Sequence, residues 1–109
     1  MLSLLVLYRQ DTEGAEGGLI DLLQGKSEDV RIEALAWYAM AKNSDWADFA
    51  AVRASVPHVD LVNGLLVFNI RGNRFRLIVY PVFPRRKLYI KALLTHKECN
   101  RKEWEKQWP

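Results

Sequence analysis

The chain has 109 residues, enough for one compact domain but too few for two. Half of the residues are apolar and 27% are charged, the balance of a folded globular protein rather than a disordered one. No apolar run approaches the ~20 residues of a membrane-spanning helix, and the apolar start at residues 2–8 lacks the flanks of a signal peptide. Cys99 is the single cysteine, so no internal disulfide forms, and no Cys/His cluster has zinc-site spacing. These features predict a cytoplasmic, single-domain protein over residues 1–109, with no metal, no cofactor and no membrane partner.

The net charge of +3 conceals an uneven distribution. Residues 1–63 contain five Lys/Arg and ten Asp/Glu, a net charge of −5, whereas residues 64–109 contain eleven Lys/Arg and three Glu, a net charge of +8. A basic half of this kind is typical of a protein with an anionic partner such as a nucleic acid. Chance asymmetry in a small domain is the alternative explanation.

The first half predicts one strand and two to three helices. Residues 2–8 form a short apolar run typical of a buried strand, and the glycine- and acid-rich residues 11–18 predict an exposed loop. A short helix is expected at residues 19–23, ending near Gly25.

Two further helices follow. Ser27 is the predicted N-cap of the first, with acidic residues in its first turn. Its expected buried stripe is Ile32, Leu35, Ala36, Ala39 and Met40, flanked by Trp37. The second helix is expected over residues 45–55 and is closed by Pro57. The tryptophans are assigned to the core.

From Leu65 onward the apolar period changes to two, which predicts a meander of antiparallel strands at residues 65–70, 74–82 and 87–94. The turns are Arg71-Gly72-Asn73 and Pro84-Arg85-Arg86. The alternation predicts a buried face that carries Phe75, Leu77, Val79, Leu88, Ile90, Ala92 and Leu94. It predicts a solvated face that carries Arg74, Arg76, Tyr89 and Lys91.

A capping-box pattern at residues 100–103 predicts a short C-terminal helix. The expected fold is therefore α+β: an N-terminal strand and two to three helices packed on a twisted antiparallel sheet, followed by a short C-terminal helix.

His96 follows the last predicted strand and is close in sequence, or on the adjacent strand, to several cations: Arg74, Arg76, Lys91 and Lys97. This combination fits phosphodiester chemistry, in which an RNA 2′-hydroxyl attacks the neighbouring phosphate, a proton must be moved, and cations stabilise the charge on phosphorus. A sheet that only binds RNA or an acidic protein is the alternative. We expect His58, in a predicted loop, to have no catalytic role, and a thiolate at Cys99 is less favoured because no orienting group is evident.

An ordered series of segments runs through the second half of the chain: Val67-Phe68-Asn69-Ile70, Gly72-Asn73-Arg74-Phe75-Arg76-Leu77-Ile78, Tyr89-Ile90-Lys91, Thr95-His96-Lys97-Glu98, and upstream Trp46, Phe49, Val52-Arg53, Pro57 and Val59-Asp60. Together these segments bear a resemblance to the HigB family of type II toxins, within the RelE-like superfamily of messenger-RNA interferases. The resemblance covers roughly residues 33–104, and residues 1–32 are divergent.

The resemblance implies a RelE-like fold and a toxin that cleaves messenger RNA in association with the ribosome. It also implies neutralisation by a HigA-type helix-turn-helix antitoxin, in a complex that represses its own operon. The family's Gly-Asn-x-x-Arg motif falls on Asn73 and Arg76, its Thr-His pair on Thr95 and His96, and its following Glu on Glu98.

From the residues and the resemblance together, we predict His96 as the proton-transfer group and Arg76 as the cation at the scissile phosphate. Arg74, Lys91 and Lys97 are predicted to bind the RNA backbone. Tyr89 and Asn73 complete the predicted RNA-binding set, with Asn73 mainly shaping the turn.

The sequence departs from the family at three places. Cys99-Asn100 stands where the family commonly has Tyr-Asp, Arg71 stands where glycine is usual, and residues 9–18 look like an insertion. The first departure favours a second hypothesis, a non-catalytic module that binds RNA or a HigA-type antitoxin. A third hypothesis is a basic scaffold protein with no role in nucleic-acid binding.

Overall fold

The computed structural model describes residues 5–8, 22–71, 74–95 and 97–98. Its elements are β1 (Leu5–Tyr8), α2 (Glu28–Lys42), α3 (Phe49–Ser55), β2 (Asp60–Val62), β3 (Leu65–Ile70), β4 (Phe75–Val82), the 3₁₀ turn η1 (Phe83–Arg85) and β5 (Lys87–Thr95). The expected loop at 11–18, most of the expected helix at 19–23 and the expected C-terminal helix lie outside the described residues.

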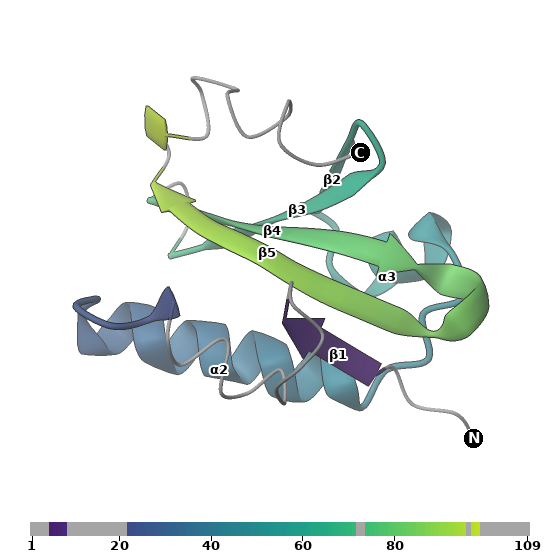
Figure 1. The fold of residues 1–109 in the computed structure, drawn as a ribbon, viewed down its shortest axis with the longest axis horizontal. Coiled ribbons are helices and arrows are strands. Elements are labelled where there is room, and N and C mark those ends of the chain that lie inside the picture. Colours follow the sequence, from purple (N-terminus) through teal and green to yellow (C-terminus); the bar gives the residue numbers. More distant parts are fainter. Residues whose placement is uncertain (1–4, 9–21, 72–73, 96, 99–109) are drawn as a thin grey trace.

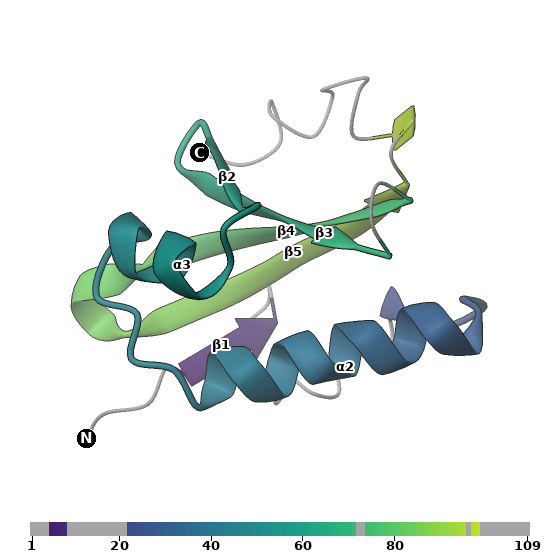
Figure 2. The same cartoon turned by 180° about the vertical axis from the view of Figure 1, so that it is seen from behind.

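The strands form a single sheet in the order β1-β5-β4-β3-β2. Neighbouring strands from β2 to β5 are antiparallel, whereas β1 joins the edge of the sheet parallel to β5. Helices α2 and α3 lie on one face of this sheet (Figures 1 and 2). The α+β class and the antiparallel meander are therefore confirmed. The alternation pattern did not reveal that β1 pairs in parallel with β5.

The sheet gains one strand that the sequence analysis missed. Strand β2 pairs with β3 through a two-residue loop, Asn63-Gly64, whose φ angles are +52° and +80°. Positive φ at both loop residues is the requirement of a type I′ turn, and Asn-Gly is the dipeptide that meets it best. The Asn-Gly signal was therefore sufficient to predict this hairpin.

The main core centres on Phe68 of β3, between two tryptophans. Trp37 of α2 meets the Phe68 ring edge-on at a centroid distance of 5.1 Å, and Trp46 stacks on it at 6.1 Å. The Trp46 indole N–H also donates to Ser55 Oγ at the end of α3, at 3.2 Å. Because α2, β3 and the connection before α3 contribute to this cluster, and the Ser55 contact ties that connection to α3, it fixes which face of the sheet the helices cover. The core assignment of Trp37 and Trp46 is confirmed.

The buried face of α2 differs from the predicted stripe. Its buried residues are Val30, Ala34, Trp37 and Ala41, whereas Ile32 is 61% exposed and Met40 is 37% exposed. Apolar residues occur at helical spacing along two sides of this helix, so the periodicity alone allowed both phases. The contact of Trp37 with Phe68 selects the observed one.

The helix boundaries also needed tertiary information. Ser27 is the N-cap of α2 as predicted, but its side chain makes no capping bond and instead donates to Asp29. Helix α3 begins at Phe49, four residues later than predicted, because Asp48 is its N-cap and accepts from the Ala51 N–H at 2.8 Å. Trp46 thus lies in the connection before α3, where it is still buried.

The start of the β3–β4 turn is tied to the first turns of α2. Arg71 Nε lies 3.1 Å from Asp29 Oδ2, and the Arg71 N–H donates to Glu33 Oε2 at 2.7 Å. Arg71 has a φ of +56°, a left-handed conformation that favours glycine. The contacts with Asp29 and Glu33 hold an arginine in this conformation.

We predict different stabilities for two substitutions of Arg71. Arg71→Ala removes the ion pairs and keeps a Cβ at positive φ, whereas Arg71→Gly removes the same ion pairs and relieves the left-handed conformation. The free energy of unfolding of the glycine variant is therefore expected to exceed that of the alanine variant by about 1 kcal/mol. Urea unfolding of both variants measures the difference, and an alanine variant as stable as the glycine variant would contradict the role given to the backbone.

Asp29 predicts a pH dependence of folding stability. A hydrogen bond from the Ser27 hydroxyl is the main reason that the pKa of Asp29 is lowered from 3.8; desolvation opposes the shift, and the Val30 N–H and the charges of Arg71 and Arg74 add to it. A carboxyl with a lowered folded-state pKa stabilises the fold above its unfolded pKa, and this contribution disappears as pH falls through the folded pKa.

Asp29→Asn is therefore expected to be less stable than the parent chain at neutral pH. The difference should shrink as pH falls below 3.8. Unfolding curves across this range measure the trend, and a difference that grows with acidity would contradict it.

Candidate nucleic-acid interface

The face of the sheet opposite α2 and α3, here called the distal face, carries a small apolar cluster. Leu65 and Val67 of β3 and Ile78 of β4 are buried in it, and the half-buried residues around it are Val62, Tyr80, Ala92 and Leu94. The main core lies on the other face and includes Leu77 and Val79 of β4. The predicted alternation of β4 is thus confirmed, with Phe75, Leu77 and Val79 directed toward the helices.

Arg76 lies on the distal face near the start of β4. It is two residues from Ile78 along the strand, and its register partners are Asn69 of β3 and Leu94 of β5. The side chain is half-buried, and its Nη1 is 3.4 Å from the Phe75 carbonyl oxygen. Arg76 is therefore a half-buried cation of the distal face.

Tyr80, Tyr89 and Lys91 form an aromatic and cationic group farther along the distal face. Tyr80 and Tyr89 are register partners, with ring centroids 6.3 Å apart and an interplanar angle of 35°. The Lys91 ammonium lies 5.8 Å from the Tyr80 ring and 5.7 Å from the Tyr89 ring. Such distances are within the range of cation–π attraction.

A β-bulge explains the position of Lys91. Ile78 pairs with Ala92, but the next residue, Val79, pairs with Ile90, so Lys91 is the extra residue on β5. Bulges commonly re-aim a side chain at functional sites.

The bulge also changes the face of the residues that follow, so one part of the predicted β5 pattern is wrong. Leu88 and Ile90 lie in the main core as predicted, but Leu93 joins them there. Ala92 and Leu94 instead pack on the distal cluster. A strict period of two cannot anticipate an inserted residue.

The end of β5 adjoins the start of β4, since Thr95 is the register partner of Phe75. The Thr95 N–H donates to Glu98 Oε1 at 2.8 Å, and the Glu98 N–H donates to Thr95 Oγ1 at 3.1 Å. This reciprocal pair is a capping box. Lys97, between them, is exposed.

The structure brings only part of the predicted set together. Arg76, Tyr89 and Lys91 share the distal face, and Lys97 lies at the strand end beside β4. Arg74 is exposed just before β4, and its charge also acts on Asp29 of α2. His96 and Asn73 lie outside the described residues, as does Cys99. His58, expected to be idle, is exposed between α3 and β2.

The sequence analysis missed Tyr80, and it named Thr95 and Glu98 without their capping contact. Tyr80 was not singled out because a tyrosine within an apolar strand gives no signal of its own. Its position beside Tyr89 becomes evident only from the register of β4 and β5. The Thr95 and Glu98 side-chain contacts were detectable, because Thr-x-x-Glu is the signature of a capping box.

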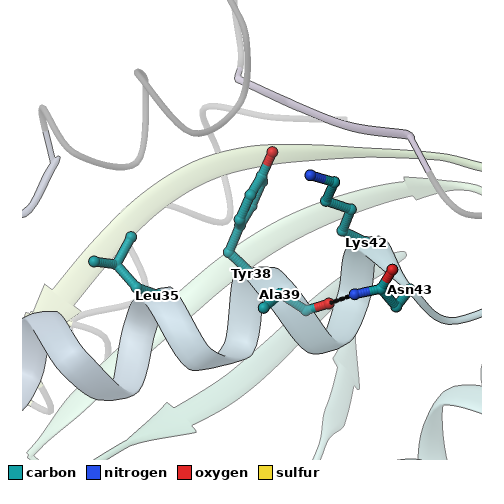
Figure 3. Close-up of a pocket in the computed structure, with 5 residues that line it drawn as sticks. All are labelled: Leu35, Tyr38, Ala39, Lys42 and Asn43. Carbon is teal, nitrogen blue, oxygen red and sulfur yellow. Dashed lines mark hydrogen bonds between the residues drawn. The ribbon is translucent and has the colours of Figure 1, made fainter.

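Two hollows on the helical side contain none of the predicted site residues. One, of about 300 Å³, is lined by Leu35, Tyr38, Ala39, Lys42 and Asn43 of α2 and its C-cap (Figure 3). The other, of about 340 Å³, is lined by residues of α2, the end of α3 and β3, among them Trp37 and Met40. Neither brings together an acid, a base and a nucleophile, so neither is a candidate active site.

Among the residues that the structure describes, no three His, Cys, Asp or Glu residues are grouped so as to hold a metal ion. No helix in the described part of the chain has the length and apolar character needed to cross a membrane.

Comparison with known proteins gives the family. Residues 31–102, about two thirds of the chain, match the HigB toxin family, described as a RelE-like toxic component of a toxin-antitoxin system. A search of curated proteins found no significant match to the chain. The matched segment contains α2 except for its first three residues, together with α3 and the whole meander from β2 to β5. The chain therefore belongs to the HigB toxin family and is the toxin component of a toxin-antitoxin system, with an antitoxin as its partner.

Proposed function

We propose that this toxin is an endoribonuclease that cleaves messenger RNA through attack by the substrate's own 2′-hydroxyl. The observation that carries the proposal is the distal face, which Arg76 shares with the neighbouring pair of Tyr89 and Lys91 on the side opposite the helices. An exposed lysine at the adjacent strand end adds to the positive charge. Positive groups beside aromatic rings suit the phosphates and bases of single-stranded RNA.

In the proposed reaction the 2′-oxygen bonds to phosphorus and the bond from phosphorus to the 5′-oxygen breaks. The products are a 2′,3′-cyclic phosphate and a 5′-hydroxyl end. His96 would move the proton between the attacking hydroxyl and the leaving oxygen, since imidazole titrates nearest neutral pH. Arg76 would stabilise the charge that develops on the phosphate oxygens. The nucleophile comes from the substrate, so the proposal requires no metal-bound water.

The finer assignments rest on the family. We propose that cleavage occurs in the cytoplasm on ribosome-associated messenger RNA, and that the antitoxin is a HigA-type helix-turn-helix protein whose complex with the toxin represses the operon. A gene for a small helix-turn-helix protein beside this one would support that partner.

The second candidate function is a non-catalytic module that binds RNA or the antitoxin. Cys99-Asn100 in place of the family's usual Tyr-Asp favours it, because a cysteine neither stacks on a base nor donates a proton as tyrosine does. Only a measurement of cleavage separates the two candidates.

Induced expression in bacteria, with mapping of 5′-hydroxyl RNA ends, tests the proposal. The parent chain is expected to arrest growth and create new ends. His96→Ala should lower cleavage about 10²–10⁴-fold, and Arg76→Ala about 10²–10³-fold. Circular dichroism confirms that each variant is folded.

The matched controls are His58→Ala and Arg85→Ala, which change an exposed histidine between α3 and β2 and an exposed arginine of η1. Both should cleave like the parent chain. No new RNA ends from the parent would refute the nuclease, and full activity of His96→Ala would refute its assignment as the proton-transfer group.

A further inference from the structure

The proposed chemistry gives no role to Tyr80, an aromatic residue of the distal face. It lies opposite Tyr89 in the register of β4 and β5, and the two rings are 6.3 Å apart. Both side chains are half-buried, and Tyr80 packs against the edge of the distal apolar cluster. One side of the pair thus rests on the sheet, and part of its surface is accessible.

The pair of tyrosines differs from ordinary core packing because a lysine ammonium lies beside both rings. The β-bulge places the extra residue of β5, Lys91, with its ammonium 5.8 Å and 5.7 Å from the two ring centroids. A surface that joins two aromatic rings to an ammonium offers stacking for a base and attraction for a phosphate. These are the two components that proteins use to bind single-stranded nucleic acid.

We propose that Tyr80, with Tyr89 and Lys91, forms a stacking subsite for one base of the single-stranded RNA substrate. Tyr80 supplies a ring face on which the base stacks, and Lys91 attracts the phosphate of the same strand. This inference rests on the proposed function, because it assigns a new contact to the same RNA.

The position of the subsite separates it from the reacting phosphate. Tyr80 is four residues from Arg76 on one strand, a distance of about 13 Å. In the proposed subsite, the base on Tyr80 belongs to a different nucleotide from the one whose phosphate meets Arg76. The subsite is expected to affect substrate binding and KM rather than kcat.

The test uses 2′-O-methyl RNA octamers of adenine or uracil, which lack the attacking hydroxyl and report binding without cleavage. Fluorescence anisotropy of a labelled octamer gives Kd for the parent chain, Tyr80→Leu and Tyr80→Phe. Leucine keeps an apolar contact with the distal cluster, and phenylalanine keeps the ring. Thermal unfolding confirms that each variant is folded.

Helix α2 offers a matched control. Tyr38 is also half-buried, and the Lys42 ammonium lies 5.9 Å from its ring (Figure 3), but this pair is on the helical side of the molecule. Tyr38→Leu therefore removes a tyrosine with a lysine neighbour outside the proposed subsite. It should bind the octamers like the parent chain.

We expect Tyr80→Leu to bind about 5- to 100-fold more weakly, and Tyr80→Phe to bind within about twofold of the parent chain. The adenine octamer should bind more tightly than the uracil octamer, since purines stack more strongly. Equal binding by Tyr80→Leu, equal losses in the leucine and phenylalanine variants, or an equal loss in Tyr38→Leu would overturn the subsite.

The outcomes also separate this inference from the proposed function. Normal octamer binding by Tyr80→Leu, with RNA cleavage by the parent chain intact, refutes the subsite alone. Ring-dependent octamer binding by a parent chain that creates no RNA ends supports the subsite and refutes the nuclease. No binding of either octamer by the parent chain overturns the subsite, whatever the RNA ends show.

Discussion

The candidate interface depends on the packing of Phe68 between Trp37 and Trp46. This contact places both α2 and α3 on one side of the sheet. Because side chains alternate along a strand, burying Leu77 and Val79 beneath the helices turns Arg76 and Tyr80 to the distal face. The core therefore determines where the charged and aromatic groups lie, and a chain that packed its helices on the other face would bury them.

Two local devices refine this division. The bulge in β5 breaks the alternation, so that the ammonium of Lys91 is held near Tyr80 and Tyr89. At the end of the same strand, the Thr95 and Glu98 pair caps the chain as it leaves the sheet. Both lie on the strand that leads to His96, which makes β5 the element that links the binding surface to the proposed chemistry.

Much of the meander could be predicted from the sequence, because period-two alternation is a strong local signal; β3 begins and ends where the pattern indicates. The phase of α2 could not, since its two apolar stripes are equivalent until Trp37 meets Phe68. The bulge in β5 could not be predicted either, because it is defined by the pairing of β5 with β4 and not by the residue types of β5. The site was reached mainly through the family resemblance, whereas Tyr80 required the register.

Methyl NMR of the chain with an uncleavable 2′-O-methyl RNA octamer tests the central claim most directly, that RNA binds the distal face. Ile78 and Leu94 report on the distal face, and the exposed Ile32 reports on α2. The account predicts that the methyl signals of Ile78 and Leu94 shift on titration while those of Ile32 stay unchanged. Shifts at Ile32 with none at Ile78 and Leu94 would contradict it.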